Sequence, residues 1–454
     1  LIPIFTTLYL LSFLDRTNIG NAKWVTSQCA QELEISGSEY NTALALYFVA
    51  YVLFEIPANV CLKRFNPQIW LPTLTLVWGI ASIAQGLVKN KAGLFGVRFL
   101  LGMTEAGLFP GVIYVFSVYY RRNERSWRVA IFFGGAALAG AFGGILAYAI
   151  GKMEGVGGRR GWEWIFILEG VITVTVSLFA YFIVPTWSHS AKFLTEAERE
   201  KLSVRLNSDS DAGQKEKFQW FYVLQAFKDP VVLGYALLFH GFAFVLYSLS
   251  LFLPTIIIDL GFASWQAQLT VPPYALATLA IGSTVWVSSN LNLRAPFIVG
   301  AAIIAIIGYI VLIATHHPGT QYFGVHLAAV GVYTGNALLL SWPGENVSGQ
   351  TKRAVAIAMQ ITIGDIGAVA GVLIYRPSLS ANDFRTPHAI AVGYLAFAII
   401  IATALAIYMK NENKRRDQVV NEGKEVEFYT REQVKAKEQG YEMGDRDVHY
   451  RYVY

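Results

Sequence analysis

The sequence has little charge and almost no cysteine. Lys, Arg, Asp and Glu make up 15% of its 454 residues, against about 25% in a typical soluble domain. Hydrophobic residues make up 54% and the mean hydropathy is +0.43, which excludes an ordinary soluble protein because no soluble core needs so much apolar material. Two cysteines, Cys29 and Cys61, are too few for a disulfide framework or a metal cage.

Catalytic patterns are also missing from the sequence. It contains no nucleophile next to a base, no cluster of metal ligands and no phosphate-binding loop. We therefore expect neither an enzyme nor a bound cofactor or metal. The net charge of +5 lies mostly in loops, so it relates to membrane orientation rather than to nucleic acid.

Long apolar runs are the feature that the sequence does have. A polar stretch at 185–230 divides them into six and six, which predicts an all-α polytopic membrane protein. We expect two six-helix bundles at 1–184 and 231–409, a central loop at 185–230 and a tail at 410–454. Hydropathy places the twelve transmembrane helices at approximately 2–22, 41–62, 70–88, 92–117, 127–150, 163–184, 231–258, 268–288, 296–314, 322–343, 354–375 and 388–409.

Short motifs support this organisation. WRVAIF and KRAVAI, about 225 residues apart, are consistent with two similar halves related as parallel repeats. Thr195 and Glu198 have the spacing of a capping box, which predicts a short amphipathic helix that begins at Thr195 and lies along the membrane surface; a flexible tether is the alternative. Three GxxxG pairs predict close approach of helices: Gly107 with Gly111, Gly140 with Gly144, and Gly367 with Gly371.

Lys and Arg collect on one side of the predicted spans. They occur at 62–65, 120–128, in the central loop, at 351–353 and at 414–416, all on the same side if the spans alternate. By the positive-inside rule this side is cytoplasmic. We therefore expect both termini in the cytoplasm.

Six charged residues within the predicted spans stand out as candidates. A charge at the centre of a membrane helix costs roughly 2.5 to 3.5 kcal/mol, so such groups line polar cavities or pair across helices. Arg98 and Glu105 lie about 10 Å apart along one helix and cannot pair with each other. Asp15 reaches the depth of Arg98, and Glu55 that of Glu105, where two neighbouring carboxylates suit the carriage of a proton. The six residues are Asp15, Arg16, Glu55, Arg98, Glu105 and Asp365.

Polar side chains at mid-depth complete a candidate binding cavity. A tyrosine in a membrane helix is more often a packing residue than a ligand contact, and His240 fits a core position as well as a site. The substrate-binding candidates are Arg98, Arg16, Asn18, Tyr47, Tyr51, His240, Tyr247, Tyr333, Asn336 and Gln360. The proton-coupling candidates are Glu105, Asp15, Glu55 and Asp365.

Several segments together resemble a known family. They are LDRTNIGNA (14–22), FEIPAN (54–59), RFLLGMTEAGLFPG (98–111), YRRNERSWRVA (120–130), GWEWIFILEG (161–170), LTEAERE (194–200), LPTIIIDLGF (253–262), SGQTKRA (348–354) and the tail ending YRYVY. With them the chain resembles the major facilitator superfamily, and within it the fungal anion:cation symporters of the allantoate, nicotinate and pantothenate permease type. The resemblance covers essentially the whole chain.

The resemblance implies a function and some roles. It implies a plasma-membrane symporter that imports a small organic anion, such as nicotinate or another carboxylate, with protons by alternating access. Arg16 with Asn18 matches an RxN element of related transporters, Arg98 with Glu105 an RxxxxxxE element, and Tyr51 a tyrosine of the second span. Asp365 stands where a more neutral run is usual, and the seventh span lacks the arginine of the animal relatives.

The expected mechanism uses these charges directly. Arg98 or Arg16 neutralises the substrate carboxylate, Glu105 carries the proton, and the protein acts as a monomer with no cofactor besides protons. One alternative is a static interhelical network of Arg98, Glu105 and Asp15. The others are a nutrient sensor that binds without transport and a proton-independent facilitator of the same fold.

Overall fold

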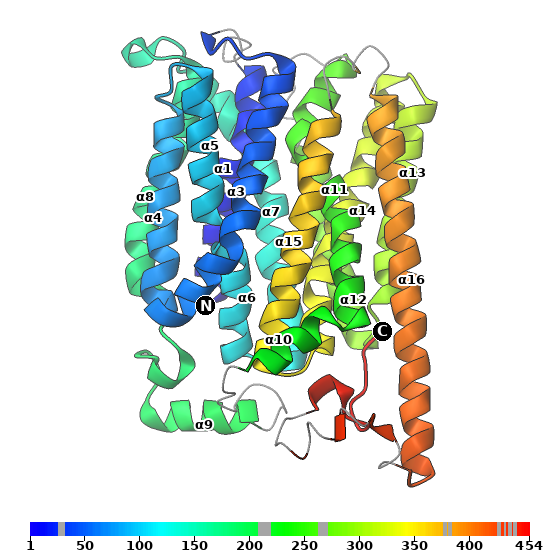
Figure 1. The fold of residues 1–454 in the computed structure, drawn as a ribbon. Coiled ribbons are helices and arrows are strands. Elements are labelled where there is room, and N and C mark those ends of the chain that lie inside the picture. Colours follow the sequence, from blue (N-terminus) through cyan, green and yellow to red (C-terminus); the bar gives the residue numbers. More distant parts are fainter. Residues whose placement is uncertain are drawn as a thin grey trace.

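The computed structural model describes residues 1–25, 32–207, 219–261, 271–375, 379, 384–424, 428–430, 433–434, 438 and 443–454. In this part of the chain long helices run side by side (Figure 1). The long helices are α1 (Ile2–Val25), α3 (Gly37–Phe65), α4 (Pro67–Gln85), α5 (Lys91–Glu105), α6 (Leu108–Tyr119), α7 (Arg122–Gly151), α8 (Gly161–Ile183), α11 (Pro230–Asp259), α12 (Val271–Leu291), α13 (Ala295–Ala314), α14 (Pro318–Asn346), α15 (Gln350–Ile374) and α16 (Arg385–Asn421).

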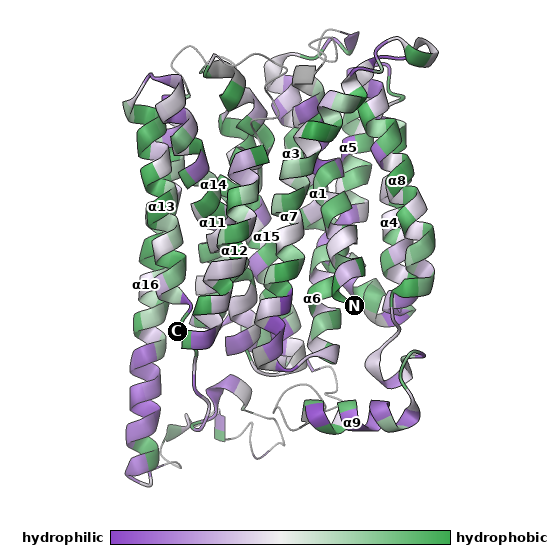
Figure 2. Ribbon diagram, turned by 180° about the vertical axis from the view of Figure 1, so that it is seen from behind, coloured by the Kyte–Doolittle hydropathy of each residue, from purple (hydrophilic) through white to green (hydrophobic). Residues whose placement is uncertain are grey.

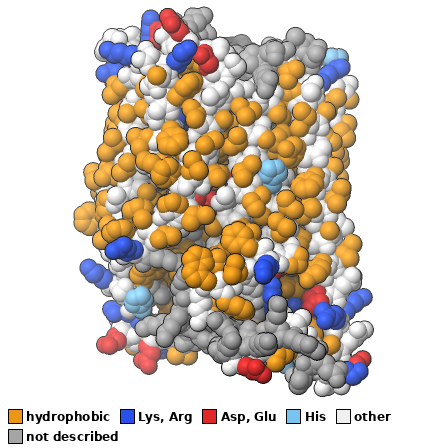
Figure 3. Space-filling model, in the orientation of Figure 1, with side chains coloured by type: hydrophobic (Ala, Val, Ile, Leu, Met, Phe, Trp, Pro, Cys, Tyr) orange, Lys and Arg blue, Asp and Glu red, His pale blue; other side chains and the backbone are white. Residues whose placement is uncertain are grey.

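These helices confirm the predicted all-α membrane fold. Within the described ranges, ten spans are long and apolar enough to cross a membrane, with α5 and α6 counted as one span at Lys91–Tyr119. Helices α1 and α12 run alongside them, which makes twelve (Figure 1). Hydrophobic side chains cover most of the middle of the face seen in Figure 3, and most of the charged side chains in view lie towards its two ends. This distribution is the one that a surrounding bilayer requires.

The twelve helices form two bundles. Helices α1 to α8 lie on one side of the molecule and α11 to α16 on the other (Figure 1). The bundles meet where α1 packs on α11, α3 on α15, and α7 on α12 and α14. Within the second bundle, α15 lies so close to α11 that a Cβ atom at Gly367 would come 2.5 Å from the carbonyl oxygen of His240, and one at Gly371 2.4 Å from that of Phe244. The close approach predicted for this glycine pair is therefore present.

The fourth span is broken once, directly after Glu105. Ala106 and Gly107 form a turn between α5 and α6. Pro110 has no N–H group, so the carbonyl of Ala106 loses its intrahelical partner there. The break places the Glu105 carboxylate at the end of α5 in the middle of the membrane span.

Both termini and the central segment lie towards one end of the molecule, which we call the terminal end (Figure 1). Here α9 (Glu196–Asn207) runs across the direction of the bundle (Figure 1). Its start has the predicted capping box: the Thr195 N–H donates to Glu198 Oε2 at 2.8 Å, and the Glu198 N–H donates to Thr195 Oγ1 at 3.4 Å. Leu206 is buried in this helix, and Leu202, one turn earlier, is partly buried, as is Arg199. The remainder of the central loop contains α10 (Trp220–Phe227), and 208–218 lie outside the described residues.

The last span continues well beyond its predicted end. Hydropathy ends it at 409, whereas α16 extends to Asn421, and its final turns are hydrophilic (Figure 2). Residues 410–421 include Lys, Glu, Arg and Gln, which favour helix without favouring the bilayer. The helix therefore leaves the membrane region at the terminal end.

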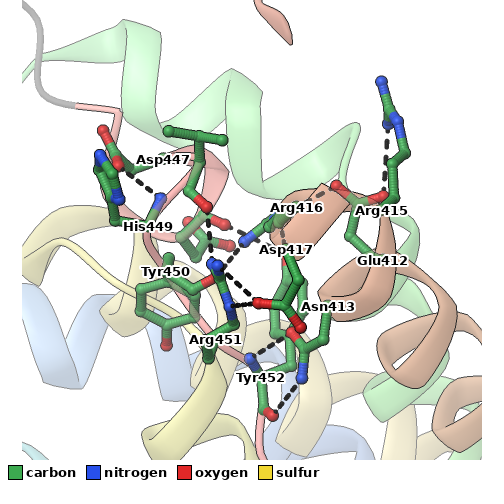
Figure 4. A network of polar contacts seen from close by, with 12 residues as sticks. Glu412, Asn413, Arg415, Arg416, Asp417, Asp447, His449, Tyr450, Arg451 and Tyr452 are labelled. Carbon is green, nitrogen blue, oxygen red and sulfur yellow. Dashed lines mark hydrogen bonds and ion pairs between the residues drawn. The ribbon is translucent and has the colours of Figure 1, made fainter. Parts of the chain in front are cut away.

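Residues 443–454, which we call the C-terminal strap, dock against this end of the second bundle. The backbone of Tyr452 exchanges two hydrogen bonds with the Asn413 side chain, at 2.9 and 2.8 Å (Figure 4). The backbone of Val453 exchanges two with Asn346, both at 2.8 Å. Arg416 donates to the Tyr450 carbonyl at 2.9 Å. The strap thus ties α14 to the hydrophilic part of α16.

Candidate functional site

Arg16 is the centre of a buried polar site where the two bundles meet. Its side chain is 4% exposed, and its Nη2 lies 3.1 Å from Glu105 Oε2. Its Nη1 donates to the Tyr247 hydroxyl at 2.8 Å. Because Glu105 belongs to α5 and Tyr247 to α11, one guanidinium group links both bundles.

The Glu105 carboxylate is held through one of its two oxygens. Oε2 accepts hydrogen bonds from the Tyr47 hydroxyl at 2.5 Å and the Ser12 hydroxyl at 3.2 Å, besides the contact with Arg16. Oε1 is buried and has no hydrogen-bond partner in the described part of the chain. This carboxylate is firmly positioned and still has an oxygen on which a proton can be placed.

Aromatic rings surround the Arg16 guanidinium. Its Cζ atom lies 5.1 Å from the ring centroid of Tyr47, 5.4 Å from that of Tyr51 and 5.5 Å from that of Tyr247. Cations at such distances are attracted to the ring faces, more strongly where water is excluded. The rings therefore help to keep a charged arginine in the membrane interior.

A small cavity lies beside Arg16, between the bundles. Its volume is about 10 Å³, which is room for about one water molecule. A ligand of several atoms does not fit, so the structure is closed around the site. The lining residues are Tyr9, Arg16, Tyr51, Phe109, Phe133, Phe239, Leu246, Tyr247, Leu340, Ile361 and Asp365.

Two further carboxylates approach the same interface. Glu55 Oε2 on α3 accepts a hydrogen bond from the Thr362 hydroxyl on α15 at 2.9 Å. Asp365, three residues further along α15, lines the cavity and interacts electrostatically with Glu55 and Arg16. The depth argument pairs Glu55 with Glu105; the structure instead places it with Thr362 and Asp365.

Asp15 and Asn18 point away from the cavity, into the first bundle. Asp15 accepts hydrogen bonds from Ser82 at 2.7 Å and Thr173 at 2.9 Å. Asn18 donates to Glu169. Residues three apart share a face of a helix, whereas Arg16 projects from a different face. Glu169, the missed member of this group, had a sequence signal, since it is a charge inside the span predicted at 163–184.

Arg98 is buried near Arg16 without an ion pair to Asp15. Arg98 is 1% exposed, and its Nη1 donates to the backbone carbonyl of Arg16 at 3.4 Å. Nε and Nη2 have no hydrogen-bond partner among the residues that the structure describes. The predicted group of Arg98, Glu105 and Asp15 is therefore not one ion-paired network, because Glu105 pairs with Arg16.

Four other candidates are bonded within the second bundle. The Tyr333 and Ser250 hydroxyls lie 2.8 Å apart, and Asn336 Nδ2 donates to the Val332 carbonyl at 2.8 Å. Gln360 donates to the Leu339 carbonyl at 3.3 Å, and His240 Nδ1 lies 2.8 Å from the Ile363 carbonyl oxygen. None of the four lines the cavity beside Arg16.

Two helical bundles with a buried charged site at their interface define a membrane transporter of small molecules. Comparison with known proteins gives the family: the model of the Major Facilitator Superfamily matches residues 5–372. The chain belongs to this superfamily. It is a multi-pass membrane transporter and not an enzyme, as the sequence predicts.

Fungal transporters are among its relatives. The chain is 35% identical over 431 residues to the MFS-type transporter cnsO of Penicillium expansum, covering 92% of this chain and 83% of the relative. It is 32% identical over 429 residues to a high-affinity nicotinic acid transporter of Saccharomyces cerevisiae, covering 94% of this chain and 79% of the relative. A solved structure with the same fold is the crystal structure of a bacterial homologue of the human lysosomal transporter Spinster, in an inward-facing and occupied conformation. The two structures have a TM-score of 0.67 at 16% sequence identity, and the match covers 89% of this chain and 96% of that one.

Proposed function

We propose that this transporter imports a small organic anion, a carboxylate such as nicotinate, together with protons. The observation that carries the proposal is the Arg16–Glu105 ion pair at the bundle interface, 3.1 Å long and buried, with one carboxylate oxygen unbonded in the described structure. A buried guanidinium is the group that best binds a carboxylate, and a buried carboxylate next to it can exchange a proton. The relative that is a nicotinic acid transporter supports the substrate class.

Competition for Arg16 is the step that couples the two solutes. When Glu105 takes up a proton, its attraction for Arg16 falls, and the guanidinium becomes available to a substrate carboxylate. Substrate and proton then leave on the other side, and the ion pair forms again. Asp15 and Asn18 do not enter this cycle, because both are bonded inside the first bundle.

The membrane potential sets a minimum number of protons. Inward movement of one net positive charge gains about 2.3 kcal/mol per 100 mV. A monocarboxylate that enters with one proton moves no net charge, so uptake driven by the potential needs at least two. Glu55 and Asp365 are further carboxylates at the interface that can take the second proton.

The remaining features of the proposal follow from charge distribution and fold. We propose that the transporter lies in the plasma membrane, as its resemblance to fungal permeases implies. Its terminal end faces the cytoplasm in this proposal, because Lys and Arg collect on that side of the spans. It works by alternating access, since the cavity is closed in this structure and must open to bind. We propose a monomer as the working unit.

Uptake of labelled carboxylates into transporter-deficient yeast tests the proposal. We expect one acid to accumulate at pH 5, much less at pH 7.5, and not at all with a protonophore. Uptake that follows the substrate gradient and ignores pH and protonophore would leave a facilitator. Binding without uptake of any acid would leave a sensor.

Glu105→Gln separates a proton carrier from a static structural network. The amide keeps the size of the side chain and an oxygen for Tyr47 and Ser12 to bond, but it cannot take up a proton. We expect accumulation to fall more than about tenfold, while exchange of labelled for unlabelled substrate continues. Glu198→Gln on α9 is the matched control and should change neither. Loss of exchange together with accumulation in Glu105→Gln would favour a purely structural role for the Arg16–Glu105 pair.

A further inference from the structure

Asp365 is a buried carboxylate that faces the cavity with an unsatisfied oxygen. The residue is 3% exposed and lines the cavity beside Arg16. Its Oδ1 has no hydrogen-bond partner within the described ranges. Thr362, one turn earlier on α15, donates its hydroxyl to Glu55 instead. A buried acceptor left unbonded costs about 1 to 3 kcal/mol or more, which a ligand that donates to this oxygen would recover.

The wall opposite Asp365 provides the complementary group. Arg16 lines the same cavity from the first bundle, and its Nε is buried without a hydrogen-bond partner in the described structure. The two walls therefore offer a donor and an acceptor from opposite bundles. A ligand that satisfies both carries an acceptor, such as a carboxylate, at one end and a donor or a proton-sharing atom at the other.

The charges around the cavity also favour a ligand that is not purely anionic. Arg16 is the cation there; it pairs with Glu105 and interacts with Asp365, which in turn interacts with Glu55. A plain anion would add a negative charge to this group. A nitrogen that shares a proton with Asp365 offsets its charge and fills its hydrogen-bonding capacity.

The rest of the cavity wall is suited to a flat ring. Aromatic side chains from both bundles dominate it: Tyr9, Tyr51, Phe109, Phe133, Phe239 and Tyr247. Aromatic rings pack well against other rings by edge and by offset face, with a gain beyond area burial alone. Slight separation of the bundles would open a slot between these rings rather than a wide polar vestibule.

We propose that Asp365 recognises a ring nitrogen, so that the site selects small heteroaromatic carboxylates over carbocyclic ones of the same size. The inference rests on the proposed function, because it assumes that the carboxylate end binds Arg16. It assigns Asp365 a role in substrate choice in addition to any role in proton movement.

Two acids that differ by one atom test the inference. Pyridine-3-carboxylate and benzoate have the same shape, and only the first has a ring nitrogen. We expect the wild type to import the pyridine acid about 10- to 100-fold more efficiently, the range of one buried hydrogen bond. In Asp365→Leu this preference should disappear, so that the ratio of pyridine acid uptake to benzoate uptake falls towards one even where both rates fall.

Controls make each outcome decisive. Ile366→Leu changes the next residue of α15, which is half exposed on the outside of the bundle, and should leave the preference intact. A wild type that imports both acids equally overturns the role of Asp365 but keeps the proposed function. A wild type that imports no carboxylate overturns both. If Asp365→Leu does not fold, Asp365→Ala is measured instead, because its side chain can neither donate nor accept a hydrogen bond, and an unchanged preference there overturns recognition by Asp365.

Discussion

The buried charges of this protein differ in how completely their neighbours neutralise them. Arg16 faces Glu105 and several rings, whereas Arg98 has two unbonded N–H groups in the described structure. At the terminal end Lys352 lies between two carboxylates, 2.5 Å from Asp229 Oδ2 and 2.6 Å from Asp445 Oδ2. Groups at the interface are left partly unsatisfied, while the group that holds the C-terminal strap is fully paired. This contrast is expected if the first must exchange partners and the second must not.

Replacing Lys352 should therefore strongly destabilise the folded protein. Lys352→Met leaves Asp229 and Asp445 buried without their cation, which costs about 3 to 5 kcal/mol. Burial raises the pKa of Asp445 above its ordinary value. A carboxyl whose pKa is raised by folding destabilises the fold when charged, so the variant should regain stability as pH falls from 7 towards 5. The thermal midpoint of the detergent-purified protein measures both effects.

Two further variants calibrate this result. Asp445→Asn keeps the Lys352–Asp229 pair and should cost clearly less than Lys352→Met. Arg451→Ala removes an exposed ion pair with Asp417 in the same strap and should cost less than about 1 kcal/mol. Equal losses in Lys352→Met and Arg451→Ala would contradict the view that the buried cation holds the strap.

At this scale the sequence identifies the charged residues but not their partners. Arg16, Glu105 and Tyr247 all stand out as polar groups within apolar spans, and the structure brings them together. Counting residues along a helix gives the depth of a side chain, but the direction in which it points also depends on how the helix is rotated against its neighbours. For this reason Asp15 and Arg16, adjacent in sequence and in depth, bond to different parts of the protein.

Among the helices, the approach of α5 to α3 determines the geometry of the site. A Cβ atom at Gly102 would lie 2.1 Å from the carbonyl oxygen of Tyr47. The same Tyr47 donates its hydroxyl to Glu105, which follows Gly102 by one turn of α5. The absence of a side chain at Gly102 therefore allows the helix contact that positions the Glu105 carboxylate.

Gly102→Ala should damage transport more than stability. The clash is with backbone, so α3 must move, at a cost of about 1 to 3 kcal/mol. A displacement of about 1 Å at the Tyr47–Glu105 contact should reduce the rate of uptake about 100-fold. Gly96→Ala, on the same helix, meets nothing within 4 Å and should keep normal uptake and stability. Similar uptake by the two variants at equal expression would disprove the role of the contact.

The sequence predicts the membrane helices better than the parts outside the membrane. All twelve spans are present near their expected positions, because hydropathy directly measures the preference for the bilayer. The extension of α16 to Asn421, the short α10 and the docking of Tyr452 and Val453 are not predicted. These features depend on tertiary partners such as Asn413 and Asn346, which no local pattern of the tail reveals.

In the whole molecule, close contacts between the bundles occur towards the end opposite the termini. A Cβ atom at Gly20 on α1 would lie 2.8 Å from the carbonyl oxygen of Leu251 on α11. Near the same end, Asn41 donates to the Tyr375 carbonyl at 3.1 Å. Towards the terminal end, a larger cavity of about 60 Å³ separates α3 and α6 from α15, lined by Asn59 and Ile357 among others. The structure is thus closed at the opposite end.

Gly20→Leu should open that end. The added side chain cannot be placed between α1 and α11, so it destabilises the conformation in which they touch, and conformations that separate them become more populated. The reporter is Leu246→Cys at the cavity wall, in a background with Cys29→Ser and Cys61→Ser. We expect a membrane-impermeant maleimide added on the side opposite the termini to label this cysteine several-fold faster in Gly20→Leu.

The control for this measurement is Gly282→Leu on α12, where an added Cβ atom meets nothing within 4 Å, and labelling should stay at the starting rate. Labelling from the terminal side should fall in Gly20→Leu, because the two open states compete for the same molecules. If labelling rose equally from both sides, the bundles would have loosened in general rather than exchanged one open state for the other. The paired measurement thereby distinguishes a gate formed by α1 and α11 from a contact that only contributes to stability.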